Sequence, residues 1–255
     1  MIRTRVIPSI LLIDEKMVKT RRFKNPSYVG DPINAVRIFN TKEVDEIIIL
    51  DIRASKRRER PNLKLISRIA TECSMPMCYG GGIATLDEAT RIFELGVEKI
   101  SIQSAALTDL KLIEQIAEKY GSSSVVVSLD IKKNWYGRST LHNSSAEKNM
   151  RIHWEKFAVD AVNAGAGELL LTSIDRDGEM SGLDLETIGK LASIVEVPVI
   201  ANGGVGSLRD VADGFKAGAS AVAAGSFFVY YGPHRAVLIS YPEYTELQNL
   251  LGAKV

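Results

Sequence analysis

The sequence contains little cysteine and little histidine. Cys73 and Cys78 are the only cysteines among 255 residues, so no disulfide framework is available, and their spacing fits no zinc motif. His142, His153 and His234 have no metal-ligand spacing with one another or with cysteine. We therefore expect no metal and no cofactor, and we interpret the cysteines as buried, reduced thiols of a cytoplasmic protein.

An excess of charge of one sign and long apolar runs are absent as well. The formal net charge is +1, which gives no argument for binding to nucleic acid or to an anionic membrane surface. No apolar run is long enough to cross a bilayer, and no small-residue cleavage site follows Arg3 and Arg5, so we expect no signal peptide. A composition of 45% hydrophobic and 25% charged residues is ordinary for a globular protein.

Eight short apolar runs alternate with amphipathic helical patterns along the chain. The runs are continuous rather than alternating, which is typical of parallel strands buried on both faces. We expect strands at residues 5–12, 46–51, 77–79, 99–102, 125–130, 168–172, in the run that follows Pro198, and at 221–224. Parallel strands with right-handed crossovers predict a single (β/α)8 barrel domain over residues 1–255.

Helices and loops fill the intervals between these strands. Asp31 and Pro32 are typical of a helix start, with the aspartate as N-cap, and Ser207 is a further candidate N-cap. The other helices are expected at residues 62–72, 86–95, 109–120, 151–164 and 185–195. The polar, basic stretch 13–31 is expected to be a long, mobile loop, and residues 132–149 are polar with no long apolar period. We expect Trp135 and Trp154 to have loop or packing roles.

Two glycine-rich stretches recur at a fixed distance. Pro198 to Val205 ends its apolar run in Gly203 and Gly204, and Pro76 to Ile83 does the same 122 residues earlier. Glycine turns let backbone amides approach an anion, and helix starts present unpaired N–H groups. The repeat therefore predicts two similar half-barrels, each with a phosphate pocket, and a substrate with phosphate at both ends. The alternative is that the glycines only close turns.

Three aspartates follow strands whose ends should meet at the barrel mouth. They are Asp51, Asp130 and Asp177, after the second, fifth and sixth strands. Carboxylates that share a site can divide acid and base roles because burial and mutual repulsion separate their pKa values. The alternative for each is that it caps a helix or pairs with a loop arginine.

Four charged residues stand at strand starts, on the opposite face of the expected barrel. Arg5, Glu46, Lys99 and Glu168 begin the first, second, fourth and sixth strands. From the residues alone we interpret them as a structural salt-bridge cluster, because charge on this face usually serves stability.

The chain resembles the cyclase subunit of imidazole glycerol phosphate synthase over essentially its whole length. The segments that carry the resemblance are Val18-Lys19, Gly30-Asp31-Pro32, Leu50-Asp51-Ile52 with Ala54-Ser55, Gly80-Gly81-Gly82-Ile83, the specific run from Glu168 through Thr172 to Gly178, and Gly203-Gly204. The resemblance implies a two-fold repeated barrel that docks a glutaminase subunit on its lower face. Ammonia would pass a charged gate there, travel through the barrel and meet a ribulosyl bisphosphate-type substrate at the mouth.

The resemblance also implies roles for individual residues. It makes Arg5, Glu46, Lys99 and Glu168 the ammonia gate. It assigns Asp130, with Asp51 and Asp177, to catalysis, and Lys19 to a mobile substrate loop. The substrate and phosphate contacts would come from Gly81, Gly82 and Ser104 in one half and from Thr172, Gly203, Gly204, Gly225 and Ser226 in the other.

One position departs from the family pattern. The family has two catalytic aspartates, at the ends of the first and fifth strands, and the first of them falls on Leu11 here. Members with this pattern are associated with acetamidino modification of bacterial surface sugars, where the barrel would hand ammonia to a third protein. The alternatives are a histidine-pathway cyclase that works with one aspartate, and a non-catalytic phosphate-binding scaffold. Retention of all four gate residues argues against the scaffold.

Overall fold

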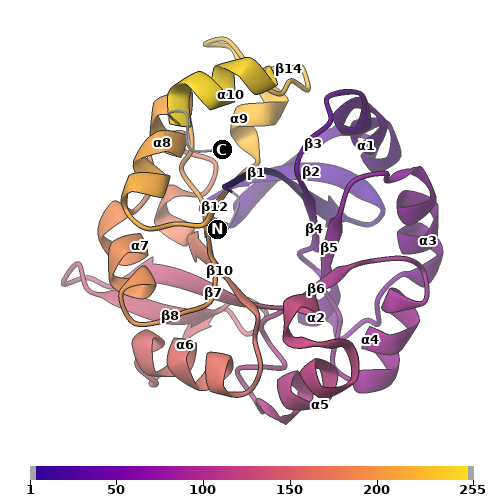
Figure 1. The fold of residues 1–255 in the computed structure, drawn as a ribbon, viewed down its shortest axis with the longest axis vertical. Helices are drawn as coiled ribbons and strands as arrows, with labels where there is room; N and C mark the ends of the chain where they lie inside the picture. Colours follow the sequence, from indigo (N-terminus) through magenta and orange to yellow (C-terminus); the bar gives the residue numbers. More distant parts are fainter. Residues whose placement is uncertain (1–3, 252–255) are drawn as a thin grey trace.

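Eight parallel strands close into a barrel, and helices surround it (Figure 1). The computed structural model describes residues 4–251. Around the ring the strands are β1 (Arg5–Ile13), β4 (Ile47–Asp51), β5 (Met77–Gly80), β6 (Lys99–Ile102), β7 (Val125–Lys133), β10 (Glu168–Ser173), β11 (Val199–Asn202) and β12 (Ala221–Ala224). Parallel pairing of β12 with β1 closes the ring. The predicted (β/α)8 barrel is confirmed.

The outer layer consists of helices between the strands. They are α1 (Pro32–Thr41), α3 (Leu63–Glu72), α4 (Leu86–Phe93), α5 (Lys111–Tyr120), α6 (Trp154–Asn163), α7 (Leu185–Ala192), α8 (Leu208–Lys216) and α10 (Tyr244–Leu251), with the short helices α2 (Ala54–Arg57) and α9 (Ser226–Val229) at the ends of strands. Asp31 caps α1 by accepting from the Asn34 N–H, as predicted. No helix within residues 4–251 is long and apolar enough to span a bilayer.

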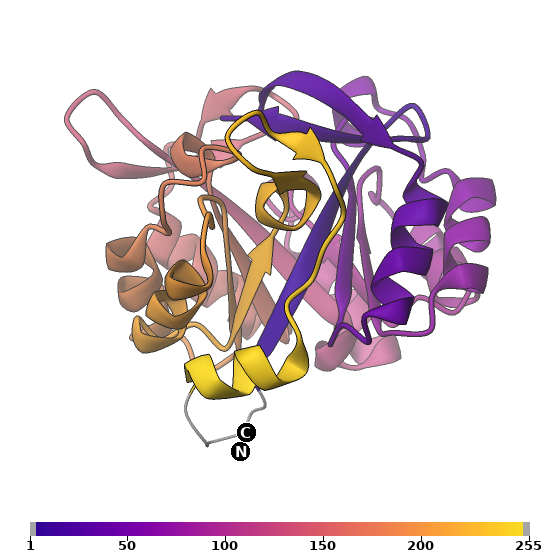
Figure 2. The same cartoon turned by 90° about the horizontal axis from the view of Figure 1, so that it is seen from above.

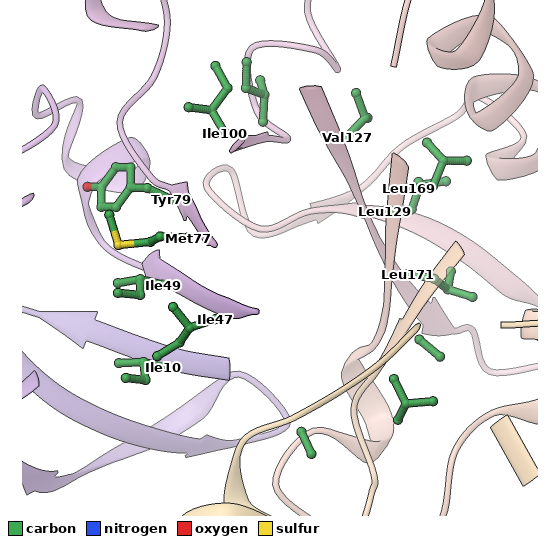
Figure 3. Packing of buried hydrophobic residues seen from close by; sticks show 14 of the residues in the cluster. Ile10, Ile47, Ile49, Met77, Tyr79, Ile100, Val127, Leu129, Leu169 and Leu171 are labelled. Carbon is green, nitrogen blue, oxygen red and sulfur yellow. The ribbon is translucent and has the colours of Figure 1, made fainter. Parts of the chain in front are cut away.

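Alternate residues of each strand face the two sides of the barrel wall, and both sides are buried. On β4, Ile47 and Ile49 belong to a core that packs against the helices, part of which is shown in Figure 3. Ile48 belongs instead to a smaller cluster inside the barrel, made by Ile7, Ile48, Cys78, Val126, Leu170, Ile200, Ala221 and Ala223. Burial on both faces is what the uninterrupted apolar runs predicted.

The internal repeat is visible in the element boundaries. Strands β5 and β6 recur 122 residues later as β11 and β12. Helices α4 and α8 both begin with a capping box, Thr85 with Glu88 in the first and Ser207 with Asp210 in the second. The two-fold repeat therefore extends from the sequence to the local geometry of the turns.

The stretch expected to be a mobile loop is a β-hairpin instead, and the second polar stretch forms a hairpin as well. After β1, Asp14 and Glu15 adopt positive φ and turn the chain into β2 (Lys16–Arg21), which pairs antiparallel with β1 and with β3 (Lys24–Gly30). After β7, the chain returns as β8 (Ser139–Asn143), followed by β9 (Lys148–Asn149). The loop prediction was wrong because Met17 and Val18, both buried, anchor the first hairpin to the core despite its basic composition.

Candidate functional site

A cavity of about 490 Å³ opens at the carboxyl ends of the barrel strands. Its lining brings together the three aspartates that the sequence predicted there, Asp51, Asp130 and Asp177. It also contains Lys19, Gly81, Ser104, Thr172, Gly203, Gly204, Gly225 and Ser226. Of the residues predicted for this face, only Gly82 is not part of the lining. Strand ends of a barrel converge in this way because all eight strands point in the same direction.

Asp130 is the most deeply buried of the three carboxylates. Its Oδ2 accepts hydrogen bonds from Gln103 Nε2, at 2.5 Å, and from the Ser144 hydroxyl. Burial raises the pKa of Asp130 to about 6, against these hydrogen bonds, which lower it. A carboxyl group that titrates near neutral pH can donate and accept a proton under physiological conditions.

Asp177 fastens the first hairpin to the loop that follows β10. Its Oδ2 accepts from Thr20 Oγ1 at 2.6 Å and from the Phe23 N–H at 3.2 Å, and its carbonyl accepts from the Arg22 N–H at 2.9 Å. Gly178 packs closely against Thr20: a Cβ at Gly178 would lie only 2.0 Å from the Thr20 carbonyl oxygen. Burial raises the pKa of Asp177. The side chain therefore holds the hairpin over the cavity.

Asp51 combines a place in the cavity with a local structural role. Its Oδ1 accepts from the backbone N–H groups of Arg53 and Ala54, each at 3.0 Å. Asp51 is not the N-cap residue of the short helix α2, which is Arg53, but its carboxylate occupies two N–H groups at the start of that helix. This is close to the capping role that the sequence left open for it. The carboxylate is thus oriented by the turn that follows its own strand.

The structure does not place Lys19 in a mobile loop, as the sequence analysis expected. It lies on β2, is buried, and donates from Nζ to the Ser9 carbonyl. A Cβ at Gly225 would lie 2.6 Å from this Nζ, so the absence of a side chain there makes room for the amine. Burial lowers the pKa of Lys19 to about 8, and the neighbouring Asp177 opposes that shift. The arrangement places a cation beside the glycine turn of the eighth strand.

The two halves of the mouth have matching glycine turns. Gly81 has a φ of +122° and Gly203 a φ of +91°, and both pack directly on backbone. A Cβ at Gly81 would meet the Asp51 carbonyl at 2.5 Å, and one at Gly203 would meet the Ser173 carbonyl at 2.7 Å. Only glycine allows this close approach, which is needed to turn the chain over the end of the neighbouring strand.

Two features of the predicted phosphate pockets differ from expectation. Gly82 donates its N–H to Ser55 Oγ at 3.1 Å and so stabilises a turn instead of facing the cavity. The amides that precede α4 and α8 are also occupied, because the capping-box carboxylates Glu88 and Asp210 accept from them. The amides available to an anion are therefore those of the cavity-lining turns, rather than those of the helix starts.

The sequence analysis did not identify the partners of the site residues. Gln103 and Ser144 hold Asp130, and Gln103 Oε1 also accepts from the Ser144 N–H at 3.2 Å. Asn202 donates to Thr172 Oγ1 at 3.2 Å. Gln103 and Asn202 stand at the ends of predicted strands, which is the signal that could have marked them. Ser144 comes from the second hairpin, where no pattern pointed to the site.

A second polar cluster closes the opposite end of the barrel. Lys99 Nζ lies 3.0 Å from Glu46 Oε2 and 3.0 Å from Glu168 Oε1. Arg5 pairs with Glu46, and its second nitrogen lies 3.1 Å from Glu168 Oε1. Although burial lowers the pKa of Arg5, the two glutamates raise it above its ordinary value overall. The four side chains form a neutral ring of alternating charge.

The barrel interior separates this ring from the mouth. It consists of the small apolar cluster described above, followed by a buried pair of hydroxyls in which Ser101 Oγ and Ser128 Oγ lie 2.6 Å apart. The path along the axis is therefore charged at one end, apolar in the middle and polar at the mouth.

The fold and its repeat define the class, a (β/α)8 barrel made of two similar halves. The family model described as "Histidine biosynthesis protein" matches residues 5–235, nearly the whole barrel.

Individual relatives give a narrower assignment. A Pseudomonas aeruginosa protein, provisionally named imidazole glycerol phosphate synthase subunit hisF2, is 54% identical over 248 residues, 97% of this chain and 99% of that protein. A protein of Exiguobacterium sibiricum named imidazole glycerol phosphate synthase subunit HisF is 38% identical over 230 residues, 89% of this chain and 91% of that protein. The chain belongs to the family of HisF-type cyclase subunits of imidazole glycerol phosphate synthase.

Proposed function

We propose that this barrel receives ammonia from a glutaminase subunit and supplies it for a glutamine-dependent amidination, in the biosynthesis of acetamidino sugars for surface polysaccharides. The glutaminase would bind the face closed by Arg5, Glu46, Lys99 and Glu168. A third enzyme would consume the ammonia at the mouth. The complex would act in the cytoplasm on a phosphorylated small molecule. The observation that carries the proposal is an intact charged ring combined with Leu11 in the mouth.

The charged ring is costly to keep as a purely structural feature. Burying ions carries a desolvation penalty that their mutual attraction offsets only partly, and apolar replacements are often neutral or stabilising. A neutral ring of four ions at the barrel base excludes charged molecules, whereas a rearrangement of one side chain would let a small uncharged molecule enter. Ammonia is such a molecule, and the apolar interior above the ring suits it.

Leu11 argues against ordinary cyclase chemistry. It lines the cavity on β1, while Asp130 lies on β7 across the ring. Of the two positions at which the family has catalytic aspartates, only the one on β7 carries a carboxyl group here. Asp51 and Asp177 line the same cavity but accept hydrogen bonds from their own turns and from the first hairpin. One acid or base group typically contributes a factor of about 10²–10⁴.

A histidine-pathway cyclase is the second candidate. The observation that favours it is Asp130, buried, held by two side chains and with a pKa near neutral. The cavity also keeps the residues predicted to hold phosphate in both halves, Gly82 excepted. A non-catalytic scaffold is the third candidate, and the retained ring argues against it.

Two measurements separate these candidates. Mixing the chain with its candidate glutaminase should form a complex on a sizing column and raise glutaminase activity. The isolated chain should turn over the ribulosyl bisphosphate-type substrate poorly with ammonium. Ordinary turnover would support the cyclase, and no complex with no stimulation would support the scaffold.

A further inference from the structure

Three hairpins project from the mouth face of the barrel. They span residues 16–30 (β2–β3), 131–146 (β7–β8) and 226–242, the last containing β13 (Tyr230–Tyr231) and β14 (Ala236–Val237). In Figure 2 the indigo β2–β3 hairpin and the long pink β7–β8 hairpin lie at the top, and the yellow helix α10 lies at the opposite end. We call these three segments the mouth hairpins.

The mouth hairpins collect most of the strongly exposed apolar side chains of the described residues. Seven large apolar side chains among residues 4–251 are more than half exposed, and six of them lie on these hairpins: Tyr28, Trp135, Tyr136, Tyr231, Val237 and Leu238. Trp135 is 97% exposed and Tyr136 85% exposed. Single exposed apolar side chains are ordinary on protein surfaces, but six of the seven on the segments around one opening mark this face as a candidate interface, and Trp and Tyr are among the residues most enriched at interface hot spots.

The aromatic tip is held in place by its own hydrogen bonds. The side chain of Asn134 accepts from the N–H groups of Tyr136 and Arg138 at 2.9 and 3.0 Å. Lys133 anchors the hairpin to the loop after β10 by donating its N–H to Asp175 at 2.7 Å. Trp135 and Tyr136 are therefore presented on an ordered turn, which lowers the entropy lost on binding.

The charges within the hairpins are of one sign, although Asp14, Glu15 and Glu147 flank them and Glu147 lines the cavity. The three mouth hairpins contain nine lysines and arginines and no aspartate or glutamate, in a chain whose net charge is +1. Some of these cations are paired, such as Arg21 and Arg22 with Glu179. Lys24 and Arg138 have no ion pair among the described residues. A protein with an acidic surface and an apolar pocket would complement this face.

We propose that the mouth hairpins dock the third enzyme, an acidic-surfaced protein that consumes ammonia, with Trp135 and Tyr136 as the main contacts. The inference rests on the function proposed above. Phe23 and Lys24 belong both to a hairpin and to the cavity lining, so the docking surface is continuous with the mouth. Ammonia that emerged into bulk water would be protonated and diluted, and a protein seated on the hairpins would prevent this.

The test uses the complex of this chain with its glutaminase, and the purified sugar-amidating enzyme of the same organism as the probe. Titrating that enzyme onto the complex should give a Kd at least tenfold weaker for Trp135→Ala/Tyr136→Ala than for wild type, by the usual weight of such anchors. Arg138→Glu should slow association and flatten its salt dependence. A matched control is Val159→Ala/Ile194→Ala, which truncates two exposed apolar side chains away from the mouth.

A second readout separates docking from folding and from the function itself. The hairpin variant should lose glutamine-driven amidation, yet retain glutaminase stimulation, with ammonium-driven amidation by the partner unchanged. Equal affinity and equal transfer by variant and wild type would overturn the docking proposal while the proposed function stands. Binding of a second copy of the chain or of a single-stranded oligonucleotide to the hairpins, in place of the enzyme, would also overturn it. Wild-type chain that does not stimulate glutaminase would contradict the proposed function instead.

Discussion

Leu11 and Asp130 lie on opposite sides of the barrel mouth. Strand β1, which carries Leu11, and strand β7, which carries Asp130, are the first and fifth of the eight strands around the ring, and both side chains line the same cavity. One side of the mouth therefore presents an apolar group where the other presents a carboxyl group that titrates near neutral pH. This pairing bears on the pH dependence of stability, through Asp130, and on turnover, through Leu11.

The raised pKa of Asp130 predicts a pH-dependent stability. The folded chain keeps a proton on this group up to a pH of about 6, whereas an unfolded aspartate loses it near 4, so the folded state binds more protons in this window. The free energy of unfolding should therefore fall as the pH rises from 4 to above 6. Asp130→Asn cannot lose a proton, so its stability relative to wild type should increase by about 1–3 kcal/mol across the window.

Urea unfolding at several pH values between 4 and 8 measures this difference. Ser144→Ala is the matched variant. It removes a hydrogen bond that stabilises the ionised carboxylate of Asp130, so the pH range over which wild-type stability falls should extend to higher pH. A stability difference between Asp130→Asn and wild type that stays constant from pH 4 to 8 would contradict the prediction.

Removing Lys99 from the charged ring should lower the stability of the fold strongly. Lys99→Met leaves Glu46 and Glu168 buried with only Arg5 to pair with, and should lower the free energy of unfolding by about 3 kcal/mol. A second change, Glu168→Gln, restores the charge balance and should recover part of this loss.

Lys216→Met on helix α8 is the control for the ring. Lys216 pairs with Asp213 at 3.1 Å but its side chain is 76% exposed, so the change should stay within about 0.5 kcal/mol. If Lys99→Met and Lys216→Met lower the free energy of unfolding equally, the ring stabilises the fold no more than a surface ion pair does.

Much of the fold was predictable because its signals are local and repeated. Uninterrupted apolar runs gave the strands, Asp31 and Ser207 marked two helix starts, and the spacing from Gly81 to Gly203 gave the two halves. The same patterns placed Asp130 and Lys99 at opposite ends of the barrel, because residues at strand ends and strand starts must separate in a parallel barrel.

The remainder depends on contacts between distant segments. No local pattern shows that Ser144, on a polar hairpin, reaches Asp130, or that Thr20 donates to Asp177. The burial of Lys19 was missed for the same reason, since a basic segment reads as a solvated loop until the buried Met17 is seen to anchor it. Gly82 shows the converse, because a glycine motif cannot tell which amide a neighbouring side chain occupies.

Gly225→Ala should weaken anion binding in one half of the mouth only. The new Cβ would lie 2.6 Å from Lys19 Nζ and 3.3 Å from the Ser9 carbonyl, so the amine must move, while the backbone at this position stays unstrained. Inorganic phosphate should bind about tenfold more weakly at the turns of Gly203 and Gly225, following the usual weight of one charge-assisted hydrogen bond.

Crystals soaked in phosphate, and phosphate titrations followed by NMR, would show this asymmetry. The site beside Gly81 and Ser104 should fill equally in Gly225→Ala and in wild type, and Ser104→Ala should have the reciprocal effect. Anion density at neither site in the wild-type chain would mean that the glycines serve only to form turns.

Leu11 predicts weak cyclase turnover in the wild-type chain. With a carboxyl group at only one of the two positions where the family has catalytic aspartates, ammonium-dependent conversion of the bisphosphate-type substrate should be at least about 10²-fold slower than with an intact pair. Turnover at an ordinary rate, on the order of 1 s⁻¹ or more, would instead identify a histidine-pathway enzyme that needs only one aspartate.

Leu11→Asp then tests whether the rest of the site is still competent. The new carboxylate would stand opposite Asp130, in a cavity that keeps Lys19 and the glycine turns, and should raise turnover measurably. Leu50→Asp is the control, because Leu50 pairs with Leu11 in the sheet and lines the same cavity but stands on β4. A gain with Leu11→Asp alone shows that one missing proton carrier limits the chemistry. If both variants and the wild type are inert while ammonia still reaches a partner enzyme, the barrel acts as a conduit for ammonia. Restoring the pair of carboxylates would then have restored no cyclase reaction, so the missing aspartate would not be what limits the chemistry.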